Sequence, residues 1–131
     1  GEGPVVNAFE ESFAASCNRK HAIAVTNGTA AIELVVHALK FGPGDEIILP
    51  SFAIISCVSQ ILRAGATPIF VDSTPNTWNM DVATVESLIT PRTKAIVPVH
   101  LYGQSAPMEE ILQIAKEYNL FVILSKKSNL M

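Results

Sequence analysis

A short segment near the start of the chain has the residue types and the order of a phosphate-binding loop. The letters NGT at 27–29 follow the apolar run AIAVT at 22–26, and a helical pattern begins at Thr29. A strand, a tight Asn-Gly turn and a helix N-terminus in succession bring free backbone amides, the positive end of a helix dipole and one hydroxyl to one point. The segment is neither a Walker A loop nor a GxGxxG turn. Phosphate binding is one hypothesis for this segment, and an ordinary turn with Thr29 as the helix cap is the interpretation that the spacing alone favours.

Other side chains could take part in catalysis or binding, but the sequence evidence for each is weaker. His100 follows a predicted strand, where an imidazole can act as an acid or base, but a half-buried histidine satisfied by the backbone is the interpretation we favour. Asp72 either binds a ligand or caps the next turn. We expect Cys57 to be a small core residue and Trp78 to anchor a polar loop to the core. Cys17 and Cys57 lie too far apart to suggest a zinc site or a disulfide framework, so we expect no metal.

The elements that must position these residues alternate between strand and helix. Short apolar runs rich in β-branched residues predict strands at 22–26, 46–49, 67–71, 94–99 and 120–124. Apolar spacings of three and four predict helices at 4–17, 29–39, 56–64, 82–88 (with Asp81 as its N-cap) and 108–118. This alternation implies an α/β three-layer sandwich with a mainly parallel sheet. Ligands of such sheets bind beyond the carboxyl ends of the strands, which selects the segments 27–30, 50–54, 72–73 and 100–103.

Composition narrows the class of protein further. The chain has 131 residues, of which 49% are hydrophobic and 16% charged, and a formal net charge of −3. One compact domain is expected at this length. The nine Lys and Arg residues form no basic stripe, which argues against nucleic acid and anionic membranes as partners. No apolar run reaches the roughly 20 residues of a membrane span, and no signal peptide is recognisable, so we expect a cytoplasmic protein.

Five segments then add up to a known pattern. In order they are NGTAAIEL, FGPGDEIILPSF, AGATPIFVDSTPNTWNMD, ITPRTKAIVPVHLYGQ and the terminal LFVI. Together they resemble the sugar aminotransferases of the DegT/DnrJ/EryC1/StrS family, and most closely its perosamine synthases, up to about Ile123. The resemblance implies the type I aminotransferase fold that binds pyridoxal 5′-phosphate (PLP). Residues 1–124 would be part of its large domain, followed by a divergent polar tail at 125–131.

The resemblance also implies a reaction and a cofactor site. Family members hold PLP through a lysine Schiff base and transfer an amino group from glutamate to a nucleotide-linked 4-keto sugar, for example in O-antigen biosynthesis. Gly28, Thr29 and Ala30 match the loop that holds the cofactor phosphate, in agreement with the physical argument. Ile54 matches the position from which relatives place an aromatic ring over the pyridine, and it lacks the ring-stacking contribution of about 1 kcal/mol.

The end of the chain departs from the family pattern. Ser125 falls where relatives have an aspartate that pairs with the pyridine nitrogen, and a hydroxyl cannot supply that negative charge. The Schiff-base lysine lies downstream in relatives, and Lys126 and Lys127 stand outside any matching motif. We therefore expect no catalytic residue in this chain, no transamination by the chain alone and at most weak PLP binding.

Partners follow from the same resemblance. Family active sites form at a dimer interface, so we expect a homodimer or pairing with a full-length relative. A non-catalytic interaction subunit is the alternative function. Because the family builds a larger sheet, we also expect an exposed apolar edge or face that further chain or a partner would cover.

Overall fold

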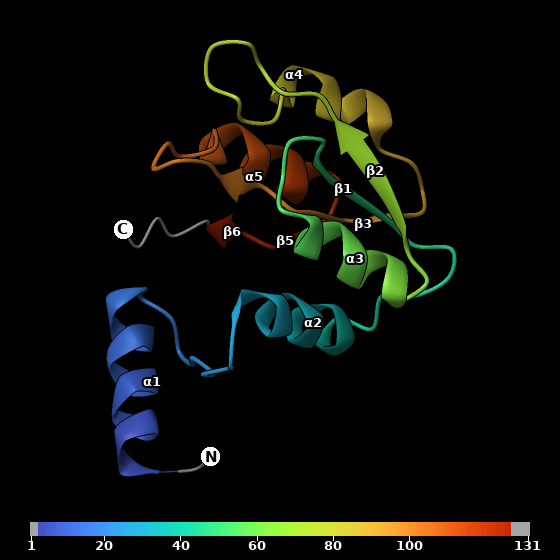
Figure 1. Cartoon of the computed structure of the whole chain (residues 1–131). Helices are drawn as coiled ribbons and strands as arrows, with labels where there is room; N and C mark the ends of the chain where they lie inside the picture. The colour runs from blue at the N-terminus through green and yellow to red at the C-terminus, as the bar shows by residue number, and fades with distance from the viewer. Residues whose placement is uncertain (1–2, 127–131) are drawn as a thin grey trace.

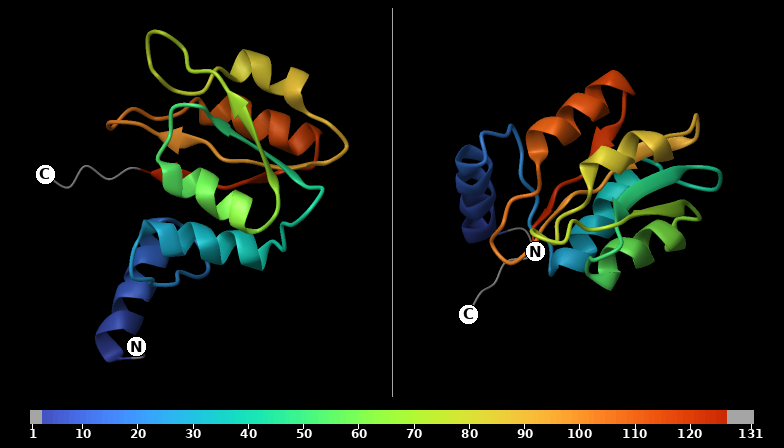
Figure 2. Two further views of the ribbon diagram at one scale, coloured as in Figure 1. Left: turned by 45° about the vertical axis from the view of Figure 1, so that its right-hand side comes forward. Right: turned by 90° about the horizontal axis from the view of Figure 1, so that it is seen from above.

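A central parallel sheet lies between two layers of helices in the computed structural model, which describes residues 3–126 (Figure 1). The strand order is β2-β1-β3-β5, and each neighbouring pair is parallel. The strands are β1 (Glu46–Pro50), β2 (Thr67–Val71), β3 (Thr93–Ile96) and β5 (Phe121–Val122). Helices α2 (Gly28–Ala38) and α3 (Ile55–Arg63) cover one face, and α4 (Val82–Val85) and α5 (Met108–Glu117) cover the other (Figure 2). The predicted α/β class and parallel sheet are confirmed.

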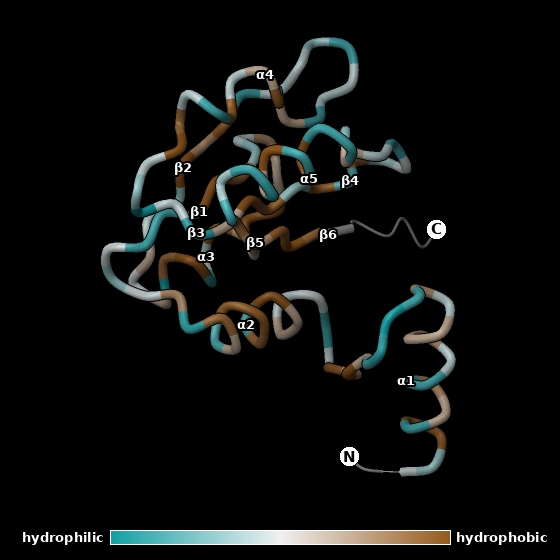
Figure 3. Tube along the Cα trace, turned by 180° about the vertical axis from the view of Figure 1, so that it is seen from behind, coloured by the Kyte–Doolittle hydropathy of each residue, from teal (hydrophilic) through white to brown (hydrophobic). Residues whose placement is uncertain are grey.

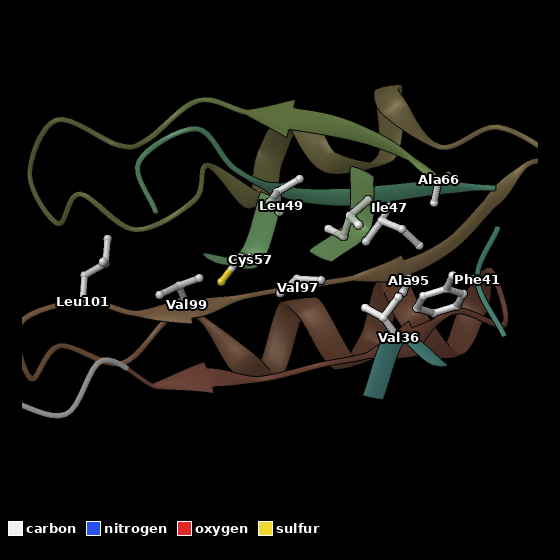
Figure 4. Close-up of a cluster of buried hydrophobic side chains, with 11 residues drawn as sticks. Val36, Phe41, Ile47, Leu49, Cys57, Ala66, Ala95, Val97, Val99 and Leu101 are labelled. Atoms are coloured by element: carbon white, nitrogen blue, oxygen red, sulfur yellow. The ribbon is translucent and has the colours of Figure 1, made fainter. Parts of the chain in front are cut away.

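Strand β1 is the centre of the core because it has a neighbour on each edge and helices on each face. Ile47, Ile48 and Leu49 have no exposed surface. Successive side chains of a strand point to opposite faces. Ile47 and Leu49 therefore join the apolar cluster beneath α2 and α3 (Figure 4), and Ile48 joins the cluster beneath α4 and α5. Burial on both faces explains why this strand is continuously apolar rather than alternating.

The predicted strand at 94–99 is divided in two. Its first part is β3, and its second part is β4 (Val99–His100), which pairs in parallel with β6 (Ser125–Lys126) in a separate two-stranded sheet. Proline has no N–H to donate to a ladder, and Pro98 lies at the break. The carbonyl of Pro98 still accepts a hydrogen bond from the backbone N–H of Ser125 at 2.9 Å. The remaining residues of the predicted polar tail lie outside the described part of the chain.

The predicted strand at 22–26 is not a strand. No described strand lies beside it, and its apolar side chains are exposed, by 69% for Ile23 and 40% for Val25. Its backbone is held instead by α1 (Pro4–Ser16), since the N–H of Ala24 donates to Glu10 Oε1 at 2.7 Å. Apolar, β-branched composition does not make a strand where no neighbour completes the backbone hydrogen bonds. Figure 3 shows this apolar segment between α1 and α2.

Helix α1 lies away from the sheet and leaves an apolar stripe uncovered (Figure 1). Val5, Phe9 and Phe13 recur every four residues and are more than half exposed. The rings of Phe9 and Phe13 stack with their centroids 5.8 Å apart. An apolar stripe on a helix is normally packed against another element, so the uncovered apolar face expected from the sequence is present.

The helices of the other layer begin where local sequence signals place them. Asp81 caps α4, since its Oδ1 accepts from the backbone N–H of Ala83 at 3.2 Å, as predicted. A 3₁₀ turn, η1 (Glu86–Leu88), continues α4 and completes the predicted helix at 82–88.

Among residues 3–126, no helix combines the length and the apolar character needed to cross a membrane.

Candidate functional site

The candidate phosphate site is the N-terminus of α2. Asn27 has an extended backbone, and its Oδ1 accepts a hydrogen bond from the backbone N–H of Ala30 at 2.9 Å. The helix itself begins at Gly28, whose φ is not positive. The predicted tight Asn-Gly turn and the alternative of Thr29 as the cap are therefore both wrong. Asparagine is among the residues preferred at the N-cap, and this was the sequence signal for the cap.

The first turn of α2 presents unused hydrogen-bond donors. The N–H groups of Ala30 and Ala31 bond to the side chain and carbonyl of Asn27. The N–H groups of Gly28 and Thr29 have no acceptor in the described part of the chain, as is usual for the first turn of a helix. Gly28 and Thr29 are exposed, and a Cβ added at Gly28 would meet nothing within 4 Å. Free amides, a hydroxyl and the positive end of a helix are what a phosphate group requires.

Ile54 lies at the N-terminus of the neighbouring helix. It is the N-cap residue of α3, and 40% of its surface is exposed. Helices α2 and α3 pack together on one face of the sheet (Figure 1). The two helices run in the same direction, and their N-termini lie on the side of the sheet where the parallel strands end (Figure 1), so Ile54 and the turn at 28–30 share a face and an edge of the sheet. This arrangement fits a phosphate-bearing ring that is held at α2 and contacted by an apolar side chain from α3.

Side-chain contacts join the loops after β1 and β2 beside this site. Ser51 Oγ donates to Asp72 Oδ1 at 3.4 Å, so the carboxylate of Asp72 contacts the neighbouring loop. The rings of Phe52 and Trp78 are tilted against each other, with their centroids 5.4 Å apart. Trp78 is 58% exposed and has a φ of +60°. The expectation that Trp78 anchors its loop to the core is therefore wrong, because the tryptophan packs at the surface against Phe52.

His100 and Ser125 mark the ends of the strands in the two-stranded sheet. The ring of His100 is half-buried, and its Nδ1 accepts from the backbone N–H of Ala106 at 3.0 Å, as the favoured interpretation requires. Cys57 donates from Sγ to Ser125 Oγ at 3.9 Å. Burial raises the pKa of the Cys57 thiol, which therefore stays protonated near neutral pH. The Ser125 hydroxyl is neutral, so it offers no charged partner to a pyridine nitrogen.

Comparison with known proteins identifies the family. Residues 1–125 match the DegT/DnrJ/EryC1/StrS aminotransferase family, and the chain belongs to it. The chain is 51% identical over 121 residues to the GDP-perosamine synthase of Caulobacter vibrioides, covering 92% of this chain and 33% of the relative. It is 47% identical over 122 residues to the GDP-perosamine synthase of Escherichia coli O157:H7, covering 93% of this chain and 34% of the relative. The chain thus spans about a third of the length of these relatives.

Solved structures give the same assignment. DesV of S. venezuelae superimposes with a TM-score of 0.90 at 39% identity, covering 94% of this chain and 33% of DesV. NtdA from Bacillus subtilis, solved with bound cofactor PMP (pyridoxamine phosphate), gives a TM-score of 0.89 at 40% identity, covering 94% of this chain and 28% of that protein. The predicted family and its PLP-dependent aminotransferase fold are confirmed.

Proposed function

We propose that this chain forms the phosphate-holding part of the cofactor domain of a PLP-dependent nucleotide-sugar aminotransferase. The observation that carries the proposal is the pair of free N–H groups, at Gly28 and Thr29, in a chain of an aminotransferase family. We further propose that the reaction moves an amino group from glutamate to a nucleotide-linked 4-keto sugar, as the similarity to GDP-perosamine synthases suggests. Amino sugars of this kind are building blocks of polysaccharides such as the O-antigen. We assign the reaction to the cytoplasm.

Each residue of the site has a distinct part in this proposal. The N–H groups of Gly28 and Thr29 and the Thr29 hydroxyl donate to phosphate oxygens, and the helix dipole favours the negative charge. Asn27 binds the N–H of Ala30 and so holds the first turn in place. Ile54 contacts one face of the cofactor ring. The cofactor, when bound, supplies the electron sink for amino transfer.

A titration of the 131-residue chain with inorganic phosphate tests the site directly. We expect saturable amide NMR shifts centred on Gly28 and Thr29, with PLP giving the same shifts and pyridoxal, which lacks the phosphate, giving none there. Thr29→Val should weaken phosphate binding about two- to tenfold, the effect of one hydrogen bond. Thr84→Val, which removes a hydroxyl from the start of α4, serves as the matched control. Shifts that spread over the surface without saturation would contradict the proposal.

A chimera tests the reaction. Residues 1–123 of this chain would replace the matching third of the Caulobacter vibrioides GDP-perosamine synthase. We expect the chimera to bind PLP and to transfer the amino group of glutamate to the nucleotide-linked 4-keto sugar. A folded chimera that binds no PLP would refute the assignment of the phosphate site, and one that binds PLP but does not accept this sugar would refute the substrate class.

The uncovered stripe on α1 favours a second candidate, a non-catalytic subunit. Val5, Phe9 and Phe13 form an apolar surface that suits a homodimer or pairing with a full-length relative. Light scattering of the chain and of the Phe9→Ser variant tests this candidate. A stable dimer that the substitution converts to a monomer supports it, and a monomer in both cases removes it.

A further inference from the structure

A concave region lies on the other face of the sheet from the phosphate site. It has a volume of about 780 Å³, within the range of roughly 300 to 1,000 Å³ that small-molecule sites occupy. The loop after β2, helix α4, the loop before α5 and α5 itself line it, in the layer opposite α2 and α3 (Figure 2). Most of its polar wall consists of amide and hydroxyl side chains, and Met80 and Ile114 supply apolar surface. The phosphate-site argument uses none of these residues.

All the charged side chains that line the cavity are negative. Asp81, Glu86 and Glu110 contribute carboxylates, and no Lys, Arg or His is among the described residues that line the cavity. Asp81 is used in capping α4, whereas Glu86 and Glu110 have no side-chain hydrogen bond or ion pair within residues 3–126. No three His, Cys, Asp or Glu side chains in that range are grouped to hold a metal ion. The wall therefore repels anions and attracts an organic cation.

A buried amide supplies an independent indication of a ligand. Asn79 lines the cavity and is 3% exposed. Its Nδ2 donates to the carbonyl of Ser105 at 3.0 Å, whereas its Oδ1 is buried without any donor in the described structure. Buried polar atoms of native proteins are almost always paired. The unpaired atom is an acceptor, so the group it lacks is a donor such as a hydroxyl or an ammonium.

We propose that this cavity binds an amino polyol without phosphate, such as a free amino sugar. The ammonium group pairs with the carboxylates of the wall, and the hydroxyls bond to its amide and hydroxyl side chains, with one donor directed to Asn79. The apolar C–H face of the sugar packs on Met80 and Ile114. A phosphate or carboxylate on the ligand would face Glu86 and Glu110 and is excluded.

The test is an NMR titration of the full 131-residue chain with D-glucosamine. We expect saturable amide shifts in the segment 74–86 and at the start of α5. D-Glucose, which lacks the charge, should bind several-fold more weakly, and D-glucosamine 6-phosphate should not bind. The double variant Glu86→Gln/Glu110→Gln should lose about fivefold in affinity for glucosamine, the scale of exposed ion pairs. Glu117→Gln, at the far end of α5 and outside the cavity, is the matched control.

The outcomes separate this site from the phosphate site. Equal affinity for glucosamine and glucose, or for glucosamine and its 6-phosphate, would overturn the proposal, as would saturable shifts at Gly28 and Thr29 instead of α4 and α5. Absence of saturable binding at millimolar glucosamine would also overturn it. A failed phosphate titration at α2 has no bearing on this result, because the two ligands and the two faces of the sheet are different.

Discussion

The side-chain oxygen of Asn27 lies 2.9 Å from the backbone nitrogen of Ala30 and accepts its hydrogen bond. This one contact fixes where α2 begins. It occupies the third N–H group of the helix and leaves those of Gly28 and Thr29 for a ligand. Asn27 is therefore a positioning residue for the proposed phosphate site.

Substitutions at Asn27 should separate stability from phosphate binding. Asn27→Ala removes the cap and should lower the free energy of unfolding by about 1 kcal/mol, the usual value of an N-cap. Asn27→Asp keeps an acceptor and adds a charge that the helix dipole favours, so stability should be retained. The same charge repels phosphate, so phosphate affinity should fall. Urea unfolding and the NMR titration measure the two quantities, and equal phosphate affinity in Asn27→Asp and the unmodified chain would contradict the assignment.

The buried Glu46 should make stability depend on acid pH. Hydrogen bonds from Thr90 and then from Arg92, whose charge adds to the effect, lower the pKa of the Glu46 carboxyl below 4.5, against the opposing effect of burial. A carboxyl whose pKa is lower in the folded than in the unfolded state stabilises the fold at any pH above its unfolded-state pKa. This stabilisation is lost as the pH falls through the folded-state pKa. Urea midpoints should therefore hold at neutral pH and drop as the pH falls through the acid range below the ordinary pKa of a glutamate.

Glu46→Gln identifies the source of that dependence. This variant should be less stable at pH 7, and its urea midpoint should change less on acidification. Glu117→Gln, which replaces an exposed carboxylate at the surface, should keep the acid dependence of the unmodified chain. Parallel pH profiles for Glu46→Gln and the unmodified chain would show that another group is responsible.

The two cysteines should differ in reactivity. Cys17 is exposed, whereas Cys57 is 1% exposed and burial raises the pKa of its thiol. Since the thiolate is the reactive form, a disulfide reagent should modify one thiol rapidly in the folded chain and the second only after unfolding. Cys17→Ser should abolish the fast phase. A fast phase that survives this substitution would mean that the packing around Cys57 opens readily.

Two glycines should respond oppositely to alanine. Gly65 follows α3 with a φ of +83°, and an added Cβ would lie 3.1 Å from Pro43 Cγ. Gly65→Ala should therefore cost at least the roughly 1–2 kcal/mol of a left-handed residue. Gly28→Ala has open space and no positive φ, so its stability should stay level or rise by up to about 1 kcal/mol. Thermal or urea unfolding of both variants checks the contrast.

Local sequence patterns were sufficient for the elements that carry their own signal. The apolar run of β1, the helical spacing of α5 and the capping of α4 by Asp81 were all predicted, and the structure contains them. The order of strands and helices also predicted the parallel sheet. These features follow from side-chain period and capping chemistry, which act over a few residues.

Contacts between distant segments were not predictable in this way. The pairing of Phe52 with Trp78 joins two loops whose sequences say nothing of each other. The cavity exists only because two segments far apart in the chain, 74–86 and 104–114, meet. The apolar segment at 22–26 is an example of a wrong local prediction. Its composition favours a strand, but no described strand lies beside it to pair with its backbone.

The family follows from five ordered segments of the sequence, and the positions of most strands and helices follow from side-chain period and capping, which involve residues close together in the chain. Phosphate binding at 27–30 stays a prediction. The folded chain, and no local pattern, places Trp78 at the surface and buries Asn79 Oδ1 without a donor among the described residues. Burial and contacts of this kind depend on which distant groups lie beside a residue, and a local pattern does not contain that information.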